Sequence, residues 1–141
     1  MAAKAAASLF GDARLFFGAA RLGKLNLLGA FDTIYLTDVP AVHPQCAIVL
    51  RLRLDRSQHG EHAITLHLID EDGQHVIKPL DGRFRVGGGT GATATSNLIL
   101  NLQGLQLKRF GELAFHLHID GKAMASLPLY IRKITPVAPN N

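Results

Sequence analysis

Apolar and polar residues alternate along most of this chain, in short runs that end at Gly, Asp or Pro. Residues 50–55 (LRLRLD) and 115–120 (FHLHID) show the alternation most clearly. Successive side chains of a strand point to opposite faces of a sheet, so a period of two is typical of a strand with one buried face. No long segment shows the 3.6-residue period of a helix. The sequence therefore predicts an all-β protein built as an antiparallel β-sandwich.

Turn signals divide the chain into seven or eight expected strands. Gly29 predicts a bend inside the second strand, and Asp120 with Gly121 predicts a tight hairpin turn. The acidic run at residues 70–73, which ends in glycine, predicts another turn. Loops are expected at residues 37–44, which hold two prolines, and at residues 87–91 and 103–111. The expected strands lie at residues 13–20, 25–36, 45–55, 61–69, 75–86, 95–102, 113–119 and 122–134.

Composition indicates one globular domain, because 48% of the 141 residues are apolar and 18% are charged. We expect this domain at residues 13–134. An alanine-rich extension at residues 1–12, frayed or forming a short helix, precedes it, and a disordered tail at residues 135–141 follows. No apolar stretch approaches the ~20 residues that a membrane span needs. The extension is too short in apolar residues for a signal core, so we expect a cytoplasmic protein.

The residues that most often carry catalysis are poorly placed in this sequence. Cys46 is the only cysteine, which excludes an intramolecular disulfide, and its apolar neighbours predict a buried, inert thiol. No serine lies in a Gly-x-Ser-x-Gly turn. The glycine-rich run at residues 87–91 lacks the Lys-Ser/Thr pair of a phosphate-binding loop, and residues 70–73 lack the further ligands of a calcium loop. We therefore predict no catalytic residues, and an enzyme is not favoured.

Several segments taken together give the chain a resemblance to a known family. They are residues 23–32 (GKLNLLGAFD), 60–62, 69–73 (IDEDG), 101–104, 110–112 and 119–121. With these segments the chain resembles a family of small bacterial proteins that is catalogued as a domain of unknown function. The resemblance covers about residues 13–132 and implies an all-β sandwich, with no activity or catalytic residue attached. The last hairpin is also similar to that of immunoglobulin-like modules, which favours an immunoglobulin-like sandwich.

Histidine is the residue type with the most chemical potential here, since the chain has seven of them. His116 and His118 share one face of an expected strand. In an immunoglobulin-like fold the strand of His67 neighbours that strand, so the three imidazoles would meet on one sheet face. His67, His116 and His118 therefore form our candidate site for a divalent transition metal, the only cofactor we consider. Ordinary solvent-facing histidines, or a pH-sensitive cluster, are the alternatives.

Two arginine pairs suggest a second kind of site. Arg51 and Arg53 share one strand face, and Arg83 and Arg85 share another. If the two strands are neighbours, the four guanidinium groups form a patch that binds phosphates or other polyanions. The formal net charge is only +4 and the basic residues are scattered, so nucleic acid is not a favoured partner. A solvated basic face is the alternative.

Edge strands provide the leading functional hypothesis, because a sandwich exposes unpaired backbone groups at the edges of its sheets. We predict a non-enzymatic protein-binding or self-assembly module whose partner is another protein or further copies of the chain. Residues 78–86 look like a guarded edge, and residues 122–134 look like an available one that Pro128 interrupts. A metal-binding protein or metal-dependent enzyme, and a weak polyanion binder, remain as alternatives.

Overall fold

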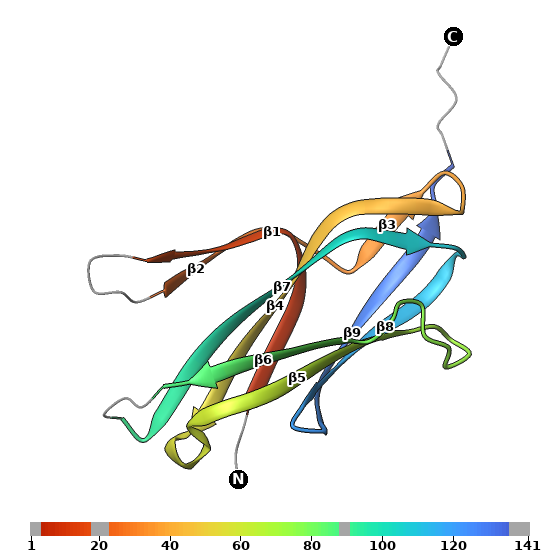
Figure 1. Ribbon diagram of the computed structural model, residues 1–141. Coiled ribbons are helices and arrows are strands. Elements are labelled where there is room, and N and C mark those ends of the chain that lie inside the picture. The colour runs from red at the N-terminus through yellow and green to blue at the C-terminus, as the bar shows by residue number, and fades with distance from the viewer. Residues whose placement is uncertain (1–3, 18–22, 88–90, 136–141) are drawn as a thin grey trace.

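The protein is built almost entirely from strands (Figure 1). A computed structural model describes residues 4–17, 23–87 and 91–135, and in these ranges the only helical element is a single 3-10 turn, Arg56–Gln58. No helix in these ranges is long and apolar enough to cross a membrane. The all-β prediction is therefore confirmed. The strands are β1 Lys4–Phe17, β2 Gly23–Phe31, β3 Thr33–Leu36, β4 Ala41–Asp55, β5 Gly60–Ile69, β6 Leu80–Val86, β7 Thr93–Leu107, β8 Gly111–Ile119 and β9 Lys122–Lys133.

The strands form two sheets. Sheet A has the order β2-β1-β4-β7, and sheet B has the order β3-β9-β8-β5-β6. All pairs are antiparallel except β3 with β9, which run parallel, with Thr33 opposite Tyr130. The prediction of purely antiparallel pairing is therefore wrong at this edge. After β2 the chain crosses from sheet A to sheet B. There β3 lies beside β9 and runs in the same direction.

One hydrophobic core joins the two sheets. Alternate residues of β4 and β8 point into it, and the side chains of Leu50, Leu52, Phe115 and Leu117 have no exposed surface. Burying a large apolar side chain contributes about 1.5–3 kcal/mol, so the alternation seen in the sequence is also the main source of stability. Cys46 is 1% exposed in the same core, as predicted, and burial raises the pKa of its thiol.

Several expected strand boundaries were wrong because long-range pairing decides them, and the strand expected at residues 75–86 begins only at Leu80. Residues 25–36 are divided between β2 in sheet A and β3 in sheet B. The predicted bend at Gly29 is confirmed by its φ of 70°, where the register with β1 is interrupted. Residues 37–44 and 103–111 were expected to be loops, yet β4 begins at Ala41 and pairs with β7 as far as Leu107.

Pro44 lies inside β4 at a point where the sheet does not need its missing N–H group. Beyond Ala47, β1 has no further pair with β4, so this end of β4 is open on that side. On the β7 side, the register skips the position where Pro44 faces Gly104, whose φ is 63°. Before the bend Leu102 is buried and Leu98 and Leu100 pack partly against the core, whereas beyond it the buried residues are the odd-numbered Leu105 and Leu107. The two strands therefore bend together at this point.

The N-terminal residues also differ from expectation. Residues 1–12 were expected to be an extension outside the domain, but Lys4–Phe17 is a strand whose first half pairs with β4. Alanine favours helices locally, and pairing with the open side of β4 overrides that preference. The second half of β1 pairs only with β2, and this hairpin points away from the two sheets (Figure 1). The predicted disordered tail lies outside the described residues except for Thr135.

Candidate functional site

The outer side of β7 is a long stretch of strand backbone without a pairing partner among the described residues. β7 is the last strand of sheet A, and within residues 4–17, 23–87 and 91–135 no strand pairs with its outer side. It is 15 residues long, TATSNLILNLQGLQL, with no proline and no charged side chain. Charged residues, prolines and short lengths are the usual features that prevent an edge strand from pairing with another chain. β7 has none of these, and its only interruption is the bend at Gly104.

The two edge strands of sheet B are better protected. The predicted guarded edge is confirmed at β6, which ends sheet B and carries Asp81, Arg83 and Arg85. β3, at the opposite edge of sheet B, has only four residues. The predicted available edge at residues 122–134 is found only in part: β3 pairs with residues 130–133 of β9, whereas residues 122–129 pair with β8 alone and Pro128 interrupts them. The Tyr130 N–H donates to the Asp32 carbonyl at 2.8 Å, so the nitrogen of Pro128, two residues earlier, faces the same side without a proton to donate.

Four histidines gather on the outer face of sheet B. β5 and β8 are neighbours, with His67 directly opposite His116. The ring of His67 meets that of His118 edge-on at 5.1 Å between centroids. His67 Nδ1 lies 3.3 Å from Nε2 of a fourth histidine, His75. The neighbouring strands assumed for His67, His116 and His118 are therefore found. Among the described residues, however, no three potential ligands already converge on one point in the manner of a metal site.

His75 was missed by the sequence reasoning, and the turn before it explains why it joins the group. Asp70 Oδ1 accepts hydrogen bonds from the N–H groups of Asp72 and Gln74, both at 2.9 Å. Gly73 has a φ of 77°, and the chain folds back so that His75 bridges to Ile69. The acidic turn is predicted from the sequence, and the pairing of Ile69 with His75 across it places His75 on the same sheet face as His67, two residues before Ile69.

The local electrostatics favour uncharged imidazole at His67. Burial lowers the pKa of His67, and the nearby rings of His118 and His75 lower it further. Asp81 acts in the opposite direction but more weakly, and its Oδ1 accepts a hydrogen bond from the Thr65 hydroxyl at 2.8 Å. A neutral imidazole is the form that binds a metal ion.

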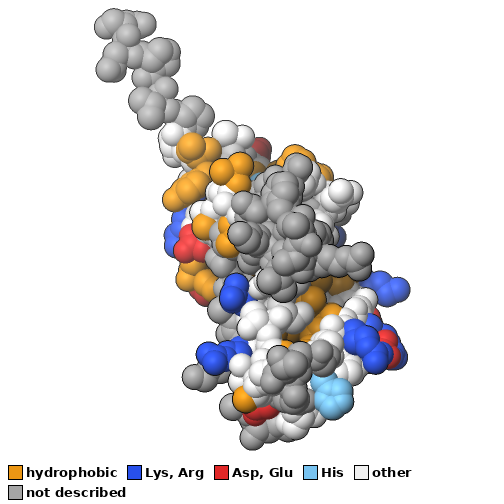
Figure 2. Space-filling model, turned by 90° about the vertical axis from the view of Figure 1, so that its left-hand side faces the viewer, with side chains coloured by type: hydrophobic (Ala, Val, Ile, Leu, Met, Phe, Trp, Pro, Cys, Tyr) orange, Lys and Arg blue, Asp and Glu red, His pale blue; other side chains and the backbone are white. Residues whose placement is uncertain are grey.

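The four arginines do not meet as the polyanion hypothesis requires. Arg51 and Arg53 lie on β4 in sheet A, whereas Arg83 and Arg85 lie on β6 in sheet B, so their strands are not neighbours. Arg83 forms an ion pair with Glu61 at 3.6 Å. Figure 2 shows Lys and Arg side chains in several separate groups on the viewed face, with acidic side chains beside some of them. The four guanidinium groups therefore do not form the single patch on adjacent strands that the hypothesis requires.

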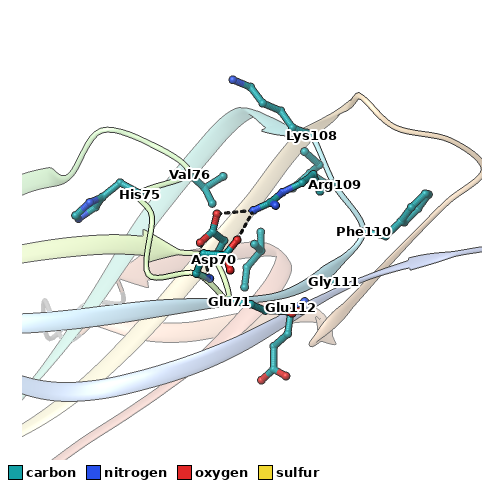
Figure 3. Close-up of a pocket in the computed structure, with 12 residues that line it drawn as sticks. Asp70, Glu71, His75, Val76, Lys108, Arg109, Phe110, Gly111 and Glu112 are labelled. Atoms are coloured by element: carbon teal, nitrogen blue, oxygen red, sulfur yellow. Dashed lines mark hydrogen bonds and ion pairs between the residues drawn. The ribbon is translucent and has the colours of Figure 1, made fainter.

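A pocket of about 310 Å³ lies between the turn after β5 and the loop before β8 (Figure 3). Arg109 reaches across it and donates to Asp70 Oδ2 at 2.7 Å. Glu71 Oε1 accepts from the Glu112 N–H at 2.6 Å. The Gln74 and Asp72 N–H groups and the Arg109 guanidinium hold the pKa of Asp70 below its usual value. These carboxylates already form hydrogen bonds within the protein. The bonds hold the turn after β5 against the loop before β8.

His62 is a further residue that sequence reasoning missed. Its Nδ1 lies 2.6 Å from Asp120 Oδ2 and its Nε2 lies 2.5 Å from the Gln58 carbonyl oxygen. Both partners are acceptors, so an imidazole protonated at both nitrogens can donate to both. The hydrogen bonds to Asp120 and to Gln58 accordingly raise the pKa of His62, and the pKa of Asp120 is lowered mainly by His62. The ring stacks on Phe84, so this pair fastens the β8–β9 turn to β5.

Comparisons with known proteins give a family and no activity. No curated protein matches the chain. One solved structure that resembles it is Pseudomonas fluorescens alkylpurine DNA glycosylase AlkC bound to DNA containing an abasic site analog, with 10% identity and a TM-score of 0.46. The match covers 89% of this chain and only 30% of the glycosylase. A family model of unknown function, DUF6941, matches residues 18–132. The chain belongs to this family of unknown function.

Proposed function

We propose that this protein is a non-enzymatic binding module that pairs the outer side of β7 with a strand of another polypeptide, and that a second copy of the chain is one such partner. The observation that carries the proposal is a 15-residue edge strand without charge or proline. Its N–H and C=O groups on that side are available to a partner, and strand addition satisfies them in one step.

An immunoglobulin-like arrangement, which we propose for the two sheets, explains why this edge is open. In such sandwiches strands B and E lie side by side, and strands C′, C, F and G follow one another in the other sheet. The β4–β7 pair and the order β6-β5-β8-β9 support this correspondence. In the constant type, strand D covers the outer side of strand E. Here only residues 87–92 join β6 to β7, which is too short for such a strand and its turns. A partner strand would therefore take the place of strand D.

A second copy suits this edge because β7 carries no charge that would repel its own image. Two β7 strands that run antiparallel are related by a two-fold axis, and each presents the same surface to the other. Such a pairing would join four strands from each copy into one continuous sheet. Register with β4 is unbroken from Thr93 to Gln103, so this part of β7 is regular enough to pair on its other side as well.

The strength of this association can be bounded from the length of the regular segment. A self-paired segment of about ten residues forms about ten backbone hydrogen bonds, each with a net value of about 1 kcal/mol. Association costs about 4–15 kcal/mol, so the surplus is at most about 6 kcal/mol, which corresponds to a dissociation constant on the order of 0.1 mM or weaker. Association should therefore be measured at high protein concentration.

Sedimentation velocity over a wide range of concentration tests the proposal. We expect the wild-type chain to form dimers at high concentration, and the double variant Asn101→Lys with Gln103→Lys to remain a monomer. Both side chains are exposed on β7, and lysine is a common protective residue of edge strands. The matched control, Ser57→Lys with Gln74→Lys, adds the same charge at exposed positions away from β7 and should still dimerise. A wild-type chain that stays monomeric at about 1 mM would refute self-association. Equal dimerisation of both variants would refute the β7 interface.

A further inference from the structure

A second surface, separate from β7, has the composition of a metal site. We propose that the outer face of sheet B binds one divalent transition-metal ion of the zinc type through His67, His75 and His118. This ligand set differs from the one that the sequence suggested, since His75 takes the place of His116. The inference does not depend on the proposed function, because β7 belongs to the other sheet.

The spacing of two ring nitrogens is the first observation that supports the proposal. His67 Nδ1 and His75 Nε2 are 3.3 Å apart. Zinc–nitrogen bonds are about 2.0–2.1 Å long, so two ligands of a tetrahedral ion have nitrogens about 3.3–3.4 Å apart. The two histidines therefore already hold the spacing of a two-nitrogen chelate. Their backbones are fixed by the Ile69–His75 bridge and by the pairing of β5 with β8.

His118 is the third ligand because its ring already touches that of His67. The two planes are inclined by 71° with centroids 5.1 Å apart, so the imidazoles are not stacked and both can direct a nitrogen toward a shared point. In the described structure the third nitrogen is not yet in position. A side-chain rotation of His118 on this partly exposed face would bring it there, and rotation between staggered conformers on a surface costs little. Water would complete the tetrahedron, as in open zinc sites.

His67 is the residue in the middle of the proposed set, because its ring contacts those of both His75 and His118. His116, directly opposite His67 on β8, and Asp81 on β6 also act on His67 electrostatically.

The 3.3 Å spacing of His67 Nδ1 and His75 Nε2 has a second explanation, because two neutral imidazoles can form an N–H···N hydrogen bond of this length. In that case the four histidines are a surface cluster with no ligand. Metal titration separates the two possibilities, since a hydrogen-bonded pair without a third nitrogen binds zinc weakly and does not require His118.

The experiment is isothermal titration of the full chain, without a histidine tag, with Zn²⁺ at about pH 7.5, supported by the visible absorption of the Co²⁺ form. We expect one ion per chain and a tetrahedral Co²⁺ spectrum. His67→Gln, His75→Gln and His118→Gln should each weaken binding by about tenfold or more. The control His43→Gln, on β4 in sheet A, should bind as the wild type does. Circular dichroism confirms that each variant is folded.

Three outcomes would overturn the proposal. The first is no binding of Zn²⁺ up to about 1 mM. The second is binding that the three variants leave unchanged, which would indicate a site elsewhere. The third is binding that His116→Gln abolishes and His75→Gln does not, which would restore the ligand set suggested by the sequence. Sedimentation of the same samples reports on β7 separately, so failure of the metal site and failure of the proposed function give different results.

Discussion

The ion pair between His62 and Asp120 gives the protein a pH-dependent contribution to stability that one isosteric substitution should remove. In Asp120→Asn the amide oxygen can still accept from the Ala63 N–H, which now donates to Asp120 Oδ1 at 2.9 Å. Asparagine also tolerates the left-handed backbone of Asp120, whose φ is 51°. The amide nitrogen of the variant then takes the place of Oδ2 and donates to His62 Nδ1, which accepts only when the imidazole is neutral. The variant therefore exchanges the ion pair for a neutral hydrogen bond, and the hairpin turn is retained.

The magnitude follows from exchanging a charged hydrogen bond for a neutral one. Hydrogen bonds to charged groups contribute about 1.5–3 kcal/mol and neutral ones about 0.5–1.5 kcal/mol, a difference of about 1 kcal/mol. The Asp120 side chain is 50% exposed while that of His62 is 12% exposed, so solvent screening reduces the difference. We expect Asp120→Asn to lower the free energy of unfolding by about 0.5–1 kcal/mol when His62 is charged.

The sign of the pH dependence follows from the two pKa shifts. The pKa of His62 is raised in the folded protein above its ordinary value of 6.5, so its contribution is complete below about pH 6.5 and is lost as the pH rises through the folded pKa. The pKa of Asp120 is lowered below 3.8, so its contribution is present above that value and is lost as the pH falls through the folded pKa. The pair therefore stabilises the fold between these two limits.

Urea unfolding of both proteins at about pH 6 and about pH 9 tests this reasoning. The wild type should be more stable than Asp120→Asn at the lower pH, and this difference should shrink as the pH rises through the folded pKa of His62. An equal difference at both pH values would contradict the argument. So would a titration of His62 by nuclear magnetic resonance that places its pKa at or below the ordinary value.

Two further predictions concern the core and the bend in β7, and both are measured by urea unfolding. Phe115 has no exposed surface, so Phe115→Ala should cost about 3–5 kcal/mol, and a loss below about 1 kcal/mol would mean that the core is loosely packed at this point. Gly104 has a φ of 63° with open space around it, so Gly104→Val should cost about 1–2 kcal/mol more than Gly104→Asn. Equal stability of the two variants would show that the left-handed backbone is not required.

Local alternation predicted the core well, because burial on one sheet face acts on each strand separately. In β8 the buried residues are Leu113, Phe115, Leu117 and Ile119, and the histidines between them lie on the outer face, as the period of two required. The hairpin turn at Asp120 is confirmed by the positive φ of Asp120 and Gly121. These features depend on residues close in sequence, so they could be read from the sequence alone.

The features of the structure that differ from the sequence-based predictions depend on which strands are neighbours. Pro44 marks a loop when read locally, but it is tolerated in β4 because β1 has already left that side. His62 and Asp120 are 58 residues apart, and only the pairing of β5 with β8 brings them together. The open side of β7 likewise results from the strand order of sheet A. No local pattern contains this information, since it arises from contacts distant in sequence.

The two proposed sites should act independently, and the strand order gives the reason. β7 ends sheet A, and its pairing groups lie in the plane of that sheet. The histidines lie on the outer face of sheet B, with the core between them and sheet A. A ligand at one site changes the affinity of the other site only if the protein has two conformations that differ at both sites. Such coupling is reciprocal. A core packed from side chains with no exposed surface resists such a change. Zinc should therefore leave the dimerisation constant unaltered, and a shift in it would mean that the metal is bound between copies rather than on one face of each.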